Sequence, residues 1–330
     1  MIVNRLYHLL SRLARTLILC FVLLLSVENA SAQFDGQYTQ YMNNLSLVNP
    51  AAVGNGNLMN VSLFQRTQWI GMPGAPIVSM LSLDAPFNLF GKKHGVGLHI
   101  LSDVFGVFNN QQVRLMYSYK QPLGKGYLNI ATNLGFVNII CNGDSINIGR
   151  LSSDDGYHTA NDPIIPTGRQ TGIGFDMGLG VQYATNKYDV GASITHVTSP
   201  EISLGDKSVF KIQPLLQVHG GYRFSFEDNT NYFLRINALV MSDFVSWTAS
   251  IAANVDIKNK FWLGAGYRFN DAFSLMAGVN VFEGFRLGYV CDIPVNQLIT
   301  KTFWSHEVFV SYSFSLAKTI GKTTKSIRIL

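Results

Sequence analysis

The chain has 330 residues, of which 47% are hydrophobic and only 14% charged, with 30 glycines, 12% aromatic residues and a formal charge of +5. Soluble domains carry about 25% charged residues, so the composition excludes a disordered chain and disfavours an ordinary soluble protein. The only cluster of basic residues lies in a short C-terminal tail, residues 317–330, so nucleic acid is not an expected partner.

The first residues have the pattern of a secretory signal peptide. Arg5, Arg12 and Arg15 precede the apolar run 17–25, and the small residues Ala30-Ser31-Ala32 follow it. The apolar run is too short to span a bilayer. We therefore expect residues 1–32 to be a signal peptide that is cleaved near Ala32.

Only two cysteines, Cys141 and Cys291, follow the expected cleavage site. Two cysteines without C-x-x-C spacing predict neither a zinc site nor a redox motif, and whether they form a disulfide stays open. We expect no metal and no cofactor.

Residues 33–57 show neither the alternation of a strand nor the periodicity of a helix. Asn49-Pro50 followed by small residues predicts a turn. A stretch of polar and aromatic residues of this length is suited to a plug inside a pore or to a periplasmic contact segment. A disordered leader is the alternative.

Residues 58–316 alternate repeatedly between apolar and polar or small side chains. In 128–137 and again in 173–183, every second residue is large and apolar with few exceptions, and the residues between are mostly small or polar. No apolar run of about twenty residues follows residue 26, so a membrane-spanning fold must here be a closed sheet. The pattern predicts an all-β, transmembrane antiparallel barrel in the outer membrane.

We expect about fourteen strands, each close to the length that a tilted membrane strand needs. They are 58–68, 77–84, 95–103, 111–120, 126–138, 172–184, 187–196, 214–224, 231–241, 244–257, 260–269, 272–281, 284–293 and 306–315. The long connections 139–171, 197–213 and 294–305 all follow odd-numbered strands, and short turns follow several even ones. Long loops outside and short turns inside would place both chain ends in the periplasm.

Three local patterns are weak signals for chemistry. The glycine-rich stretch 172–180 lacks the G-x-G-x-x-G spacing of a nucleotide site. The histidines are not accompanied by a nucleophile motif. The acidic residues Asp154, Asp155 and Asp162 do not have EF-hand spacing. We therefore expect a protein that is not an enzyme.

Strand parity places two cations, Arg66 and Arg114, inside the barrel. It places three carboxylates, Asp176, Asp256 and Asp292, inside as well. Buried cations need partners, and these aspartates or carbonyls of the N-terminal segment can supply them.

The stretch Arg66, Gln68 and Trp69 suggests how the N-terminal segment is held. We expect these residues to clamp residues 33–57 as a plug, in contact with the Asn49-Pro50 turn. An interior salt bridge that only stiffens the barrel is the alternative.

Several motifs follow one another in a characteristic order. They are Gln-Tyr-Thr-Gln-Tyr-Met at 37–42, Asn49-Pro50-Ala51, Arg-Thr-Gln-Trp at 66–69, Gly-Ala-Pro at 74–76, Pro-Leu-Gly-Lys-Gly at 122–126, Phe-Arg-Leu-Gly-Tyr at 285–289 with Asp292, and Ser305-His306-Glu307. In this order they resemble the PorP/SprF outer-membrane proteins of the type IX secretion and gliding apparatus. The resemblance implies a component that anchors periplasmic ring lipoproteins or peptidoglycan-binding components, or one that supports export and attachment of a secreted adhesin.

The alternative is a transporter of hydrophobic small molecules. Fatty-acid transporters of the FadL type also resemble fourteen-strand barrels with an Asn-Pro-Ala turn in an N-terminal hatch. The Arg-x-Gln-Trp and Gly-Ala-Pro motifs favour the PorP/SprF resemblance. Bound fatty acid or co-purified periplasmic lipoproteins would distinguish the two functions.

Overall fold

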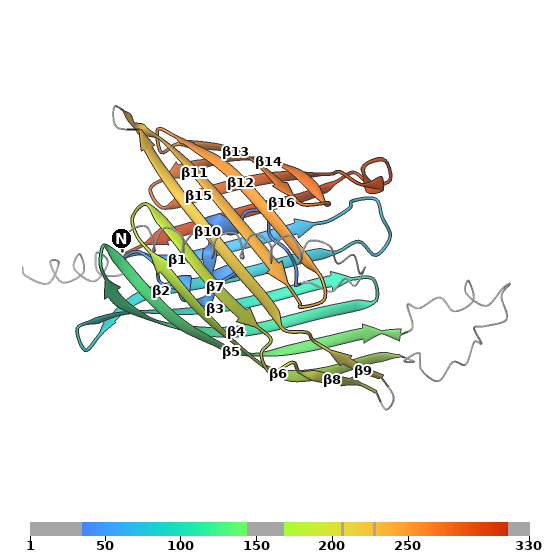
Figure 1. Cartoon of the computed structure of the whole chain (residues 1–330). Helices are drawn as coiled ribbons and strands as arrows, with labels where there is room; N and C mark the ends of the chain where they lie inside the picture. Colours follow the sequence, from blue (N-terminus) through green and yellow to red (C-terminus); the bar gives the residue numbers. More distant parts are fainter. Residues whose placement is uncertain (1–34, 144–167, 206–207, 227–228, 316–330) are drawn as a thin grey trace, which may run out of the picture.

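The computed structural model describes residues 35–143, 168–205, 208–226 and 229–315. Within these ranges, fourteen antiparallel strands form a closed barrel (Figure 1). The barrel strands are β1 (Met59–Thr67), β2 (Ile77–Leu89), β3 (Lys92–Phe105), β4 (Phe108–Leu123), β5 (Gly126–Asn142), β6 (Arg169–Ala184), β7 (Tyr188–Thr195), β10 (Leu215–Phe226), β11 (Asn229–Ser242), β12 (Trp247–Ile257), β13 (Phe261–Arg268), β14 (Ala272–Phe282), β15 (Phe285–Pro294) and β16 (Ser305–Phe314). The barrel closes because β1 pairs with β2 on one side and with β16 on the other.

The prediction of fourteen barrel strands is confirmed. Most strand ends agree with the expected ones to within three residues. Strand β2 runs further, to Leu89, because its hairpin with β3 supplies pairing partners beyond Pro86. Within the described residues, no helix is long and apolar enough to cross a membrane.

One hairpin was missed in the sequence. The expected loop 197–213 contains β8 (Glu201–Leu204) and β9 (Ser208–Lys211), which form a two-stranded sheet separate from the barrel sheet. Their apolar side chains Ile202 and Leu204 are buried against Ile139 of β5. This packing, rather than any local signal, gives the loop its structure.

Alternation along the strands sorts side chains between the outer face and the lumen as predicted. On β5, the outward residues Ile130, Leu134 and Phe136 are about half exposed, whereas Asn129 and Asn133 are buried. Such an apolar outer face is typical of strands that meet lipid.

The two cysteines do not form a disulfide. Both are free: Cys141 is buried near the end of β5, and Cys291 lies on β15. These strands are not neighbours in the barrel.

The barrel has two structurally different ends. The connections after β1, β3, β5, β7, β11, β13 and β15 meet at one end, which we call the loop end because it carries the longest connections. The short connections 90–91, 124–125, 185–187, 258–260 and 283–284 meet at the other, the turn end.

Residues 35–57, here called the inner segment, lie within the barrel (Figure 1). They form three short 3-10 helices, η1 (Tyr41–Asn43), η2 (Leu45–Leu47) and η3 (Pro50–Ala52). Side chains from η1 and η2 pack against apolar lumen residues such as Leu239 and Trp262. The lumen is therefore filled by chain that is not part of the sheet.

Candidate functional site

The inner segment runs the length of the lumen from the loop end to the turn end. Asp35 lies near Asp103 and Asp243, which stand where β3 and β11 approach the loop end. At the opposite end, the Gly54 amide donates to Asp84 at 3.0 Å, and Lys120 donates to the Gly54 carbonyl. The chain then enters β1 at the turn end.

The expectation of a periplasmic N-terminus falls on residue 33, which lies outside the described residues. The nearest described residue, Asp35, is at the loop end. The number of strands determines only that β1 begins at the turn end. Residues 35–57, which precede β1, run through the lumen from the loop end to that point.

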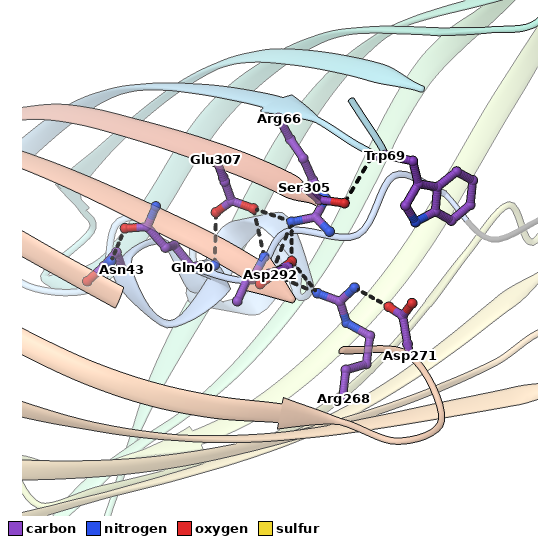
Figure 2. A network of polar contacts seen from close by, with 10 residues as sticks. Gln40, Asn43, Arg66, Trp69, Arg268, Asp271, Asp292, Ser305 and Glu307 are labelled. Carbon is purple, nitrogen blue, oxygen red and sulfur yellow. Dashed lines mark hydrogen bonds and ion pairs between the residues drawn. The ribbon is translucent and has the colours of Figure 1, made fainter. Parts of the chain in front are cut away.

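A buried ion-pair network holds the inner segment near η1, and Arg66 is its centre (Figure 2). Arg66 lies 2.7 Å from Asp292 and 3.3 Å from Glu307. It also donates to the hydroxyl of Thr39 at 3.1 Å. All three charged side chains are buried. A second cation, Arg268, reaches Thr39 at 2.7 Å and Asp292 at 3.3 Å.

Glu307 fixes the backbone of the inner segment as well. Its carboxylate accepts the amides of Thr39 and Gln40 at 2.8 and 2.9 Å. Arg66 and Glu307 are also direct partners in the pairing of β1 with β16, so the network spans the strand pair that closes the barrel. Removing one member of a buried ion pair leaves an unpaired charge and costs about 3–5 kcal/mol.

A second network holds the start of the inner segment. Asp35 lies 3.0 Å from both Arg114 and His196. His196 in turn lies 3.1 Å from Asp176, and Arg114 lies 3.8 Å from the same carboxylate. Strands β4 and β6, the loop residue His196 and the inner segment thus share one set of charges.

Ionisation in this second network depends on its neighbours. Burial alone would lower the pKa of His196, but the Asp35 and Asp176 carboxylates raise it to about 9. Burial favours the neutral form of Asp35, yet His196 and Arg114 together hold its pKa well below the ordinary range. At neutral pH the network is therefore a charged one.

The Asn49-Pro50 turn forms as predicted and is buried in the lumen wall. The Asn49 side chain accepts the Ala51 amide at 2.9 Å and so caps η3. Its amide nitrogen lies 3.0 Å from the Val181 carbonyl of β6 and 3.1 Å from a ring nitrogen of His219. A Cβ atom at Gly180 would lie 2.3 Å from the Asn49 side chain, so only glycine leaves room for the turn at this position.

The other sequence-predicted residues are placed differently. Gln68 and Trp69 follow the end of β1 at the loop end, and their backbone amides bond to Pro76 and Ser305. Figure 2 shows the Trp69 indole apart from the ion-pair network. Both residues follow the end of β1, so strand parity does not place their side chains in the lumen, and their part in the clamp stays a prediction.

Of the three predicted aspartates, Asp292 partners Arg66 and Asp176 partners Arg114. Asp256 lies instead near the turn end, 3.1 Å from Arg235. The sequence-based analysis missed Glu307, although alternation along β16 places it inside. Thr39 and Asp35 gave no such signal, since they lie in a segment without periodicity.

Several solved barrel structures are similar to this chain in fold at low sequence identity. The toluene transporter TodX of Pseudomonas putida is 12% identical over 87% of this chain and 96% of its own, with a TM-score of 0.48. Omp33 of Acinetobacter baumannii is 6% identical over 79% of this chain and 98% of its own, with a TM-score of 0.46. The translocator domain of the autotransporter NalP from Neisseria meningitidis is 13% identical over 79% and 90%, with a TM-score of 0.44.

The comparison with curated proteins finds no match to this chain. The family comparison matches residues 30–312 to the type IX secretion system membrane protein family PorP/SprF. The match includes the inner segment and nearly the whole barrel. The chain therefore belongs to the PorP/SprF family of outer-membrane β-barrel proteins.

Proposed function

We propose that this protein is a non-enzymatic scaffold of the type IX secretion and gliding apparatus, with a lumen closed by the inner segment. It would anchor periplasmic ring lipoproteins or peptidoglycan-binding components, or support export and attachment of a surface adhesin. The observation that carries the proposal is the inner segment, which is tied to the barrel wall by two ion-pair networks and runs through the lumen from one end to the other.

A transporter of the FadL type needs an apolar ligand site, and the lumen beside the apolar side chains of the inner segment offers little room for one. The cavity between the inner segment and the wall around Tyr41, Gln217 and Met276 has a volume of about 40 Å³. Pockets for small molecules usually measure about 300–1,000 Å³. The filled lumen therefore favours the scaffold over the transporter.

We propose further that the loop end faces the cell exterior and the turn end the periplasm, after removal of residues 1–32. The difference in connection length supports this orientation. Reporter cysteines at Asp155 in the longest loop and at Asn186 in a turn, in a background without the native cysteines, test it. We expect a membrane-impermeant maleimide to label Asp155→Cys on intact cells but not Asn186→Cys. The reverse pattern would invert the orientation.

Chemical cross-linking in native outer membranes, followed by affinity purification and mass spectrometry, tests the function. We expect components of the secretion apparatus among the cross-linked proteins and no tightly bound hydrophobic ligand in the purified barrel. Stoichiometric fatty acid or hydrocarbon without any protein partner would support the transporter instead.

A further inference from the structure

The turn end of the lumen contains a polar pocket that the inner segment does not fill. The pocket has a volume of about 380 Å³, and we call it the turn-end vestibule. Its charged lining residues come from the 185–187 turn and from β7, β10, β11, β12 and β15. They are Lys187, Asp189, Arg223, Arg235, Asp256 and Arg286.

Positive charge exceeds negative charge in this lining. Two guanidinium groups share one carboxylate, since Arg235 lies 3.1 Å and Arg286 4.0 Å from Asp256. The carboxylate of Asp189 lies 3.2 Å from His219, which is its ion-pair partner among the described residues. Residues 227–228, which include two acids in the turn after β10, lie outside the described residues.

Two of the cations have no carboxylate partner among the residues that the structure describes. Arg223 packs on the ring of Phe233 at 4.1 Å, and its backbone amide bonds to the Lys187 carbonyl at 2.7 Å, which brings the two cations to neighbouring positions. Arg223 is moreover the direct cross-strand partner of Arg235. Like charges placed directly opposite each other destabilise a sheet. Such an arrangement is explained if an anion binds between them.

A buried donor lies in the wall of the same pocket. Asn237 lines the vestibule with only 4% of its surface exposed, and its amide nitrogen has no hydrogen-bond partner among the described residues. A buried donor without a partner destabilises the fold unless a ligand or water satisfies it. The Asn237 amide supplies a hydrogen-bond donor, and the three arginines beside it supply positive charge. Together they favour a negatively charged acceptor as the ligand.

We infer that the turn-end vestibule binds carboxylates of an acidic peptide segment that a periplasmic partner inserts into the barrel. Paired guanidinium groups are suited to carboxylates because the planar fork can donate two parallel hydrogen bonds. The site lies on the lumen face, and the strands separate it from lipid, which favours a peptide over a lipid headgroup. The inference rests on the proposed function and assigns that function a contact site.

Amine footprinting on the purified full-length protein tests the site without the native partner. The probe is hexaglutamate, with hexalysine and inorganic phosphate as controls, and the readout is the rate of acetylation of Lys187. Lys125, in the turn between β4 and β5 outside the vestibule lining, is the internal reference. We expect hexaglutamate to slow acetylation of Lys187 alone, and Arg223→Gln to weaken this protection roughly tenfold, as one charge-assisted bond predicts.

Three outcomes would overturn the inference. They are equal protection of both lysines by hexaglutamate, protection of neither, and protection of Lys187 by phosphate that equals the protection by the peptide. Equal protection by phosphate would indicate a site for small anions only. Unchanged heat-modifiability of Arg223→Gln, whose side chain is exposed, shows that the variant is folded.

Cross-linking with the charge reversals Arg223→Glu and Lys125→Glu separates this inference from the proposed function. We expect the first variant to lose the partners that wild type and the second retain. If Arg223→Glu retains them, the scaffold stands and the vestibule site is wrong. If wild type itself cross-links to no component of the apparatus, the scaffold is wrong, and the footprinting still decides whether the vestibule binds acidic peptides.

Discussion

Thr39 offers the sharpest way to loosen the inner segment without disturbing the barrel wall. Its hydroxyl donates to Asp292 at 2.7 Å and accepts from Arg66 at 3.1 Å and Arg268 at 2.7 Å. Thr39→Val keeps the shape of the side chain and removes all three contacts. The pairs of Arg66 with Asp292 and Glu307 belong to the wall and remain.

The magnitude follows from these contacts. A hydrogen bond to a charged group contributes about 1.5–3 kcal/mol, and here three such bonds share one oxygen. We expect Thr39→Val to weaken docking of the inner segment by roughly 2–4 kcal/mol, which corresponds to a roughly 30- to 1,000-fold rise in the undocked population.

Planar-bilayer conductance measures that population, together with the rate at which protease cleaves within residues 35–57. We expect intermittent openings and faster cleavage for Thr39→Val than for wild type. Thr195→Val is the matched control, because Thr195 is also buried but its hydroxyl has no partner among the described residues. If Thr39→Val stays as silent and as protease-resistant as the control, the network only stiffens the barrel wall.

Three further predictions concern single residues. In wild type the charged His196 stabilises the fold fully below about pH 6.5, and this effect is lost as pH rises through about 9. The free energy of unfolding by urea in detergent should therefore fall across that range in wild type, and His196→Gln should remove this pH dependence. Gly180→Ala should lower the temperature of heat-modification, because overpacking against the Asn-Pro turn costs about 1–3 kcal/mol, whereas Gly220→Ala, whose Cβ would have no contact closer than 3.8 Å, should not. Leu179→Arg, on the outer face of β6, should impair assembly into membranes by about 2–4 kcal/mol while Leu179→Met assembles normally, and equal assembly of the two would show that this face does not meet lipid.

The sequence was sufficient to predict the barrel because strand alternation is a local signal. It repeats every two residues whatever the partner strand is, so Arg66, Arg114 and Asp292 could be placed in the lumen without knowing the register. The same parity places Glu307 in the lumen, whereas its pairing with Arg66 depends on the register of β1 against β16.

The course of the inner segment could not be predicted in the same way. Residues 35–57 adopt short 3-10 helices whose positions depend on lumen contacts distant in sequence, such as Thr39 with Glu307 and Asn49 with Val181. Nothing local indicates that the segment starts at the loop end. The β8–β9 hairpin was missed for a similar reason, because its strands are short and depend on packing against β5.

The most direct test is the conductance of the full-length protein compared with a variant that lacks residues 35–55. We expect the full-length barrel to be electrically silent and the shortened barrel to conduct steadily, because the inner segment is buried within the lumen. A steady current through the full-length protein, equal to that of the shortened variant, would contradict a closed scaffold and favour a pore.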